Sequence, residues 1–255
     1  MTAVLEVSGL TKRFARDDTA TIALRDFNLS IEEGTFVTIL GRSGCGKSTM
    51  LNLLSGLTKP SAGTVNYRGT PHIGPTVDIG YLTQSDTLMP WRDVLKNVQM
   101  PLELQGMDQA EQRRRAMDHI ERVGLKGFES SYPRELSGGM RRRASLARLL
   151  AGGASTLLMD EPFGALDAQL RHELQEELLR LWTGSGTTIV FVTHDIEEAL
   201  LLGDRVVVLG PLGTILRDEE IDIARPRSVD ETRLDANFVR LHKELASALR
   251  EGAAA

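Results

Sequence analysis

Eight residues from Gly41 to Ser48, GRSGCGKS, fit the pattern G-x-x-x-x-G-K-[ST]. Glycines let the backbone pass close to a phosphate group, and a helix that begins here offers unpaired N–H groups. Lys47 adds a cation, and the hydroxyl of Ser48 can bind Mg²⁺. The pattern therefore predicts a phosphate-binding loop. The residues expected to contact the bound group are Gly41, Ser43, Gly44, Cys45, Gly46, Lys47, Ser48 and Thr49.

Two adjacent acids, Asp160 and Glu161, follow an apolar run at residues 156–159. Neighbouring residues on a strand point to opposite faces. We therefore expect Asp160 to face Mg²⁺ beside the phosphates, and Glu161 to orient the attacking water or accept a proton from it. An acidic turn that only caps a strand is the alternative interpretation of Asp-Glu-Pro, and the phosphate-binding loop disfavours it.

The loop needs a strand before it and a helix after it, and the sequence predicts both. Residues 35–40, TFVTIL, form a short apolar run between Gly34 and Gly41, as expected of a buried strand. Apolar residues over 47–57 have helical spacing. This context also disfavours the alternative of a glycine-rich turn that only ends a strand.

Strands and helices alternate along much of the remaining chain, which implies a parallel α/β sheet. Further strands are predicted at 65–67, 79–81, 155–159, 188–193 and 205–209, with a helix over 169–182. Polar and apolar residues alternate over 5–10 and 24–31 as in half-buried antiparallel strands, and a loop is expected between them at 16–21.

The pattern changes to mainly helical at about residue 86, which indicates an inserted helical subdomain. We expect a single domain over residues 1–255. Its core would be formed by 1–85 and 153–230, with the helical subdomain at 86–152 and a C-terminal helix and tail at 231–255. The last helix is expected to pack on the fold.

Charge and composition exclude several classes of protein. The 255 residues carry 30 Lys and Arg against 35 Asp and Glu, a net charge of −5, so no global positive field would attract nucleic acid. The arginine runs at 113–115 and 141–143 are interpreted as solvated faces. The longest stretch without charged residues, 181–194, is too short to span a bilayer, and the single cysteine fits a reducing compartment.

A third motif, Leu136-Ser-Gly-Gly-Met140, lies between the phosphate-binding loop and the acidic strand. With these three motifs in this order, the chain resembles the ATPase subunit of ATP-binding cassette (ABC) transporters. Met140 stands where that family usually has Gln. The resemblance implies an α/β P-loop NTPase fold with a RecA-like core, a mostly parallel sheet, an N-terminal antiparallel β part and the helical insert. It also implies ATP and Mg²⁺ as cofactors, with a head-to-tail homodimer that closes on ATP and opens after hydrolysis.

The resemblance implies roles for further residues. Lys47 would act on the phosphates, Gln84 would sense Mg²⁺ and water, and His194 would contact the γ-phosphate; Ser48, Gln84 and Asp160 would hold the metal. Ser137, Gly138 and Gly139 would contact the ATP bound by the partner copy, and Asp167 would couple the two nucleotide sites across the dimer. Phe14 would stack on adenine. Without the resemblance, Gln84 is interpreted as a polar residue at a strand end, His194 as structural and Phe14 as part of the sheet edge.

Residues 88–98, 160–167, 193–199 and 223–227 resemble those of importers for nitrate, sulfonate, taurine and bicarbonate. This similarity implies a peripheral protein on the cytoplasmic face of the membrane. Its partners would be an integral-membrane permease and, indirectly, a periplasmic or extracellular solute-binding protein, with no nucleic acid. The alternative is a soluble ABC ATPase of nucleic-acid repair or translation, although the long coiled-coil insertion or second cassette typical of that class does not occur here.

Overall fold

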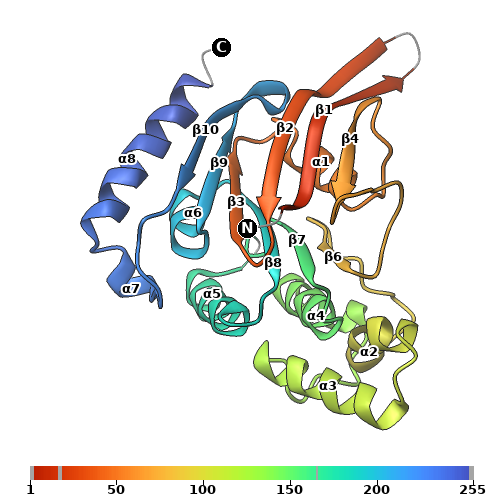
Figure 1. The fold of residues 1–255 in the computed structure, drawn as a ribbon. Helices are drawn as coiled ribbons and strands as arrows, with labels where there is room; N and C mark the ends of the chain where they lie inside the picture. Colours follow the sequence, from red (N-terminus) through yellow and green to blue (C-terminus); the bar gives the residue numbers. More distant parts are fainter. Residues whose placement is uncertain (1–2, 17–18, 165, 253–255) are drawn as a thin grey trace.

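The computed structural model describes residues 3–16, 19–164 and 166–252, and this part of the chain contains two sheets (Figure 1). The larger sheet has the strand order β10-β9-β3-β8-β7-β6. Its strands are β3 (Phe36–Gly41), β6 (Ile79–Leu82), β7 (Thr156–Asp160), β8 (Thr188–Thr193), β9 (Arg205–Leu209) and β10 (Ile215–Glu220). The strands from β9 to β6 pair in parallel, and β10 pairs antiparallel with β9. The predicted parallel α/β sheet is confirmed.

The smaller sheet is antiparallel and has the strand order β2-β1-β4-β5. Its strands are β1 (Ala3–Arg16), β2 (Thr19–Glu32), β4 (Ala62–Tyr67) and β5 (Thr70–Pro71). The predicted antiparallel pair is confirmed, but the loop predicted at 16–21 is longer than the observed one, since Arg16 pairs with Thr19. Backbone pairing in a hairpin does not require alternating apolar residues, so the sequence pattern did not indicate it. Residues 17 and 18 lie outside the described part of the chain.

Helices cover both sides of the larger sheet (Figure 1). The α-helices are α1 (Lys47–Leu54), α2 (Val94–Leu104), α3 (Gln109–Arg122), α4 (Gly138–Ala151), α5 (Ala168–Trp182), α6 (Ile196–Leu202), α7 (Val229–Thr232) and α8 (Ala236–Glu251). Short 3₁₀ turns are η1 (Pro133–Glu135) and η2 (Pro211–Gly213). Within the described residues, no helix has the length and apolar character needed to cross a bilayer.

Three buried clusters hold these layers together. The first packs α1 between the two sheets, and contains Leu51 of α1, Leu24 of β2 and Leu158 of β7. The second joins α2, α3 and α4 to the other face of the larger sheet, and contains both Phe191 of β8 and Leu146 of α4. The third packs α6 and α8 beside β9. The helical segment between β6 and β7 therefore shares a hydrophobic core with the sheet.

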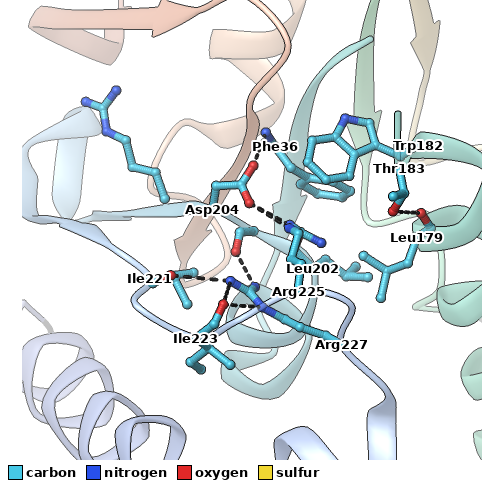
Figure 2. Close-up of polar contacts among 12 residues, drawn as sticks. Phe36, Leu179, Trp182, Thr183, Leu202, Asp204, Ile221, Ile223, Arg225 and Arg227 are labelled. Atoms are coloured by element: carbon cyan, nitrogen blue, oxygen red, sulfur yellow. Dashed lines mark hydrogen bonds and ion pairs between the residues drawn. The ribbon is translucent and has the colours of Figure 1, made fainter. Parts of the chain in front are cut away.

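The chain between β10 and α7 is fixed by two arginines (Figure 2). Asp204 accepts hydrogen bonds from the Phe36 N–H at 3.0 Å and from Arg225 Nε at 2.8 Å, and the Arg225 guanidinium lies 4.4 Å from the centroid of a Trp182 ring. Arg227 is buried. Its guanidinium donates to the carbonyls of Leu200, Leu201, Gly203, Ile221 and Ile223. These bonds connect the C-terminal helices to the core.

Candidate active site

Most of the predicted phosphate, metal and water residues lie at the carboxyl ends of four adjacent strands, β3, β8, β7 and β6. The glycine-rich loop begins at the end of β3, His194 follows β8, Asp160 ends β7, and Gln84 comes two residues after β6. Parallel strands present these ends at one edge of the sheet, which is where open α/β sheets bind ligands. Residues distant in the sequence are brought together there by strand order.

The glycine-rich loop has the backbone that its sequence predicts. Gly46 has a φ of 109° at the start of α1, and a Cβ there would lie 2.7 Å from the Ala23 carbonyl oxygen. Only glycine fits this turn without displacing β2. Lys47 is buried, and its Nζ donates to the carbonyls of Gly41 at 2.7 Å and Arg42 at 2.9 Å. The ammonium group is thus held inside the loop.

A cavity of about 220 Å³ lies over this loop. It is lined by Ala23, Ser43, Gly44, Gly46, Lys47, Ser48, Thr49, Gln84 and Glu161. The structure therefore places the predicted phosphate-loop residues, except Gly41 and Cys45, around one space with Gln84 and Glu161. The Cys45 side chain is buried, and burial raises the pKa of its thiol.

Asp160 is buried and is hydrogen-bonded to Ser48, which lines this cavity. Burial is the main influence and raises the pKa of its carboxyl, while a hydrogen bond with Ser48 and the positive charges of Lys47 and Arg142 oppose that rise. Mg²⁺ prefers oxygen ligands and takes only one or two carboxylates from a protein that also binds phosphates. The adjoining carboxylate and hydroxyl oxygens of Asp160 and Ser48, with the Gln84 side chain at the same cavity, fit such an ion. Within the described residues, no cluster of three His, Cys, Asp or Glu residues offers another metal site.

Glu161 reaches the cavity through an unusual backbone. Its φ is +46°, in the left-handed region that non-glycine residues seldom adopt, and its N–H donates to the Val192 carbonyl at 3.0 Å. One oxygen of the Glu161 carboxylate lies 3.3 Å from Nδ1 of His194. The carboxylate and the exposed imidazole thus form a pair at the cavity. Strained residues of this kind concentrate at functional sites.

The segment that carries His194 is held by a carboxyl group that the sequence analysis missed. Glu198 is buried and accepts hydrogen bonds from the Thr193 hydroxyl at 2.6 Å and from Gln175 Nε2 at 3.1 Å. Burial raises the pKa of this carboxyl. A larger cavity of about 830 Å³, between α5, α6 and α8, also borders His194 and contains none of the phosphate-loop residues.

Ser137, Gly138, Gly139 and Asp167 lie on other elements and do not line the cavity over the phosphate-binding loop. Ser137 is exposed at the N-terminus of α4, where its hydroxyl accepts from the Met140 N–H at 3.2 Å. Asp167 similarly accepts from the Leu170 N–H at the start of α5, at 3.0 Å. Ala165, in the same predicted motif as Asp167, is outside the described residues.

Phe14 is 46% exposed on β1, with Lys12 Nζ 5.0 Å from its ring centroid. It does not line the cavity, although Ala23 of the adjacent strand β2 does. The ring therefore lies outside the buried core, at the sheet edge, and its stacking on adenine stays a prediction.

The arginine run at 141–143 was expected to be solvated, and this prediction is wrong for Arg142. Only 5% of Arg142 is exposed, whereas the run at 113–115 is exposed as predicted. Helical spacing could have found this: positions 142, 146 and 149 lie on one face, and Leu146 and Leu149 are buried. Arg142 was predicted to be exposed because arginine side chains are seldom buried.

Comparison with known proteins identifies the family. The family model described as ABC transporter matches residues 24–164. An uncharacterized ABC transporter ATP-binding protein of Methanocaldococcus jannaschii, MJ0412, is 45% identical over 98% of this chain and 93% of its own length. The taurine import ATP-binding protein TauB of Yersinia pestis is 45% identical over 82% of this chain and 80% of its own. The nitrate import ATP-binding protein NrtD of Synechocystis is 40% identical over 96% and 95%.

Solved structures agree. A dimeric post-hydrolysis state of the ATP-binding cassette MJ0796, bound to ADP and Pi, superimposes with a TM-score of 0.79 and 33% identity, over 86% of this chain and all of that one. A second dimeric structure of the same cassette gives a TM-score of 0.80. The motifs, the cavity at the ends of the parallel strands and these similarities lead to one conclusion: the chain belongs to the ABC transporter family, as an ATP-binding cassette with ATPase chemistry.

Proposed function

We propose that this cassette powers an importer for nitrate, a sulfonate, taurine or a related small anion. The observation that supports hydrolysis most directly is the single cavity shared by the phosphate-binding loop, Gln84 and Glu161. The importer assignment is supported by relatives named for taurine and nitrate import that match most of this chain.

In the proposed reaction, Lys47 and the backbone of residues 44–49 bind the triphosphate of ATP. Ser48, Gln84 and Asp160 would hold Mg²⁺, which, when bound, neutralises charge on the phosphate oxygens. Glu161 accepts a proton from the attacking water. The water oxygen bonds to the γ-phosphorus as the bond from that phosphorus to ADP breaks, giving ADP and phosphate. His194, beside Glu161, donates a hydrogen bond to the γ-phosphate.

We further propose that two copies share each ATP. Ser137, Gly138 and Gly139 form a helix start with N–H groups available to an anion, away from the chain's own cavity. In a head-to-tail dimer they would meet the triphosphate bound by the partner copy, with Asp167 linking the two sites. ATP would close this dimer, and hydrolysis would open it. Phe14 would stack on the adenine ring.

The partners follow from this arrangement. The nucleotide-binding core would consist of residues 1–85 and 153–230, the helical subdomain of 86–152, and the C-terminal helix and tail of 231–255. Trp91 and Leu104, at opposite ends of the α2 segment, are 73% and 74% exposed, which supports a protein partner at the helical subdomain. That partner would be a membrane permease, supplied by a periplasmic or extracellular solute-binding protein, with this chain at the cytoplasmic face.

Two experiments test the proposal. Deleting the gene should abolish growth on nitrate, taurine or an alkanesulfonate as sole nitrogen or sulfur source, and uptake of the affected labelled compound should fall. Affinity purification from detergent-solubilised membranes should recover a polytopic membrane protein. Recovery of nucleic acid in its place, with uptake unchanged, would favour the alternative of an ATPase of nucleic-acid repair or translation.

A further inference from the structure

Arg142 is the most buried cation of α4, and its side chain ends behind the candidate active site. It lies five residues after Ser137 on the same helix, and only 5% of it is exposed. Its three guanidinium nitrogens all donate to backbone carbonyls. The acceptors are Thr83 and Gln84 from Nη1, Asp160 and Glu161 from Nη2, and Pro162 from Nε.

These acceptors come from two separate segments of the site. Thr83 and Gln84 follow β6, whereas Asp160 to Pro162 end β7 and continue into the turn with the left-handed residue Glu161. The bonds to Asp160 and Glu161 are 2.6 and 3.0 Å long. A single planar group therefore fixes the backbone on both sides of the cavity. Arginine suits this position because it has five N–H donors in a rigid fork.

Neighbouring arginines of α4 extend this contact along the segment after β6. Arg141 Nε donates to the Asp86 carboxylate at 2.8 Å. Arg148 donates to the carbonyl of Thr87 at 2.8 Å and to its hydroxyl at 2.6 Å. With Arg142 on residues 83 and 84, α4 holds the segment 83–87 at successive points, so that this helix and Gln84 are mechanically connected.

Burying the Arg142 guanidinium costs desolvation free energy, and its bonds to the backbone of the site account for its presence. Burial lowers the pKa of the Arg142 guanidinium, and no carboxylate in the described part of the chain is hydrogen-bonded to it, although Asp160, Asp86 and Glu161 attract its charge. A neutral, apolar side chain would avoid this desolvation. It would, however, leave buried carbonyls of the catalytic turn without a donor.

We propose that Arg142 is a positioning residue that couples the orientation of α4, which has Ser137 at its N-terminus, to the placement of Gln84 and Glu161. The inference rests on the proposed function. α4 rises about 1.5 Å per residue, so Ser137 and Arg142 are about 7.5 Å apart along one rigid helix. When the Ser137 end docks on the ATP of the partner copy, any rotation of α4 is transmitted through Arg142 to the backbone that carries the proposed base.

The test compares Arg142→Gln and Arg142→Lys with Arg143→Gln as matched control. Arg143 is the next residue on α4, but it donates to the carbonyls of Val123 and Gly124, away from the cavity. We expect Arg142→Gln to lower kcat for ATP about 10- to 100-fold, as for small misplacements of catalytic groups, with KM and the Kd for ATP changed less than about threefold. Arg142→Lys keeps the charge and three donors and should recover part of kcat. Arg143→Gln should have the kcat of the parent.

A second readout separates coupling from simple loss of stability. In a Glu161→Gln background, Arg142→Gln should weaken ATP-driven dimerisation about tenfold or more relative to Arg143→Gln, although each monomer still binds ATP. If Arg142→Gln lowers Tm but leaves kcat and dimerisation as in the control, Arg142 only stabilises the fold and the inference is wrong. If Arg142→Gln does not fold, Arg142→Lys decides: an unchanged kcat overturns the inference.

Failure of the underlying function would look different. If Glu161→Gln alone hydrolyses ATP at the parent rate, the proposed mechanism itself is wrong, whatever Arg142 does. If Glu161→Gln is inactive and Arg142→Gln retains full kcat, only the positioning role of Arg142 is lost.

Discussion

Replacing Glu161 with Gln should stop ATP hydrolysis while leaving ATP binding intact. The two side chains have nearly the same shape, so the left-handed turn at φ +46° carries the same strain, and the Gln carbonyl oxygen can still accept from Nδ1 of His194 at about the 3.3 Å observed. Only the ability to accept a proton from water is removed. The phosphate-binding loop, which holds the triphosphate, is unchanged.

The size of the effect follows from the role assigned to the carboxylate. A positioned general base contributes about 10²- to 10⁴-fold, which corresponds to about 3 to 5 kcal/mol in the activation free energy. Binding should change little, and the sign is known: removing a negative charge that faces the cavity makes ATP binding equal or tighter. ATP should therefore accumulate uncleaved, and the closed dimer should persist.

The assay has three parts: phosphate release for kcat, equilibrium binding of ATP for Kd, and light scattering with Mg-ATP for the dimer. Glu176→Gln is the matched control, because Glu176 lies 3.4 Å from Nε2 of His172 on the exposed side of α5, outside the cavity over the loop. Hydrolysis by Glu161→Gln within about threefold of the control would refute the general-base role. Loss of ATP binding together with hydrolysis would show that the carboxylate supports the fold of the site.

Three further predictions concern stability, each measured by chemical denaturation. Gly46→Ala should cost at least about 2 kcal/mol more than Gly44→Ala, since both have positive φ but only the Gly46 Cβ would meet a backbone oxygen at 2.7 Å; equal losses would contradict this. Burial raises the pKa of Glu198, so the stability contributed by its protonated form is present below about pH 4.5 and is lost as pH rises through the folded pKa. Over that window the free energy of unfolding of Glu198→Gln should rise relative to that of the parent. A difference between the two that does not depend on pH would exclude the pKa shift. Arg227→Met should lower the free energy of unfolding by about 3 kcal/mol or more, because several buried carbonyls lose their hydrogen-bond donor. Arg250→Met, at an exposed position, should stay within about 0.5 kcal/mol of the parent.

The phosphate-binding loop could be predicted because its information is local. The glycine spacing and the flanking apolar periods lie within about twenty residues, and the structure has the strand, turn and helix in that order. The parallel core strands β3, β7, β8 and β9 could be predicted for the same reason, since strands buried on both faces are continuous apolar runs.

Other elements depend on contacts that no local pattern records. β10, ILRDEE, is mostly charged and becomes a strand because its backbone pairs with β9 at the sheet edge. The helix α6 has a local signal, an Asp195 cap followed by two glutamates, that the sequence analysis used only as a family motif. The burial of Arg142 depends on carbonyls from two distant segments, so its face on α4 was predictable but its partners were not. The roles assigned to individual site residues remain predictions.

The left-handed turn at Glu161 has a consequence for how this protein can evolve or be engineered. Glycine or asparagine would occupy that conformation with less strain, which typically costs on the order of 1–3 kcal/mol, so the unliganded chain would become more stable with either. Both would delete the carboxylate. Screens that reward thermal resistance alone should therefore drift toward inactive cassettes at this one position, and a thermostable variant worth keeping must gain its stability elsewhere.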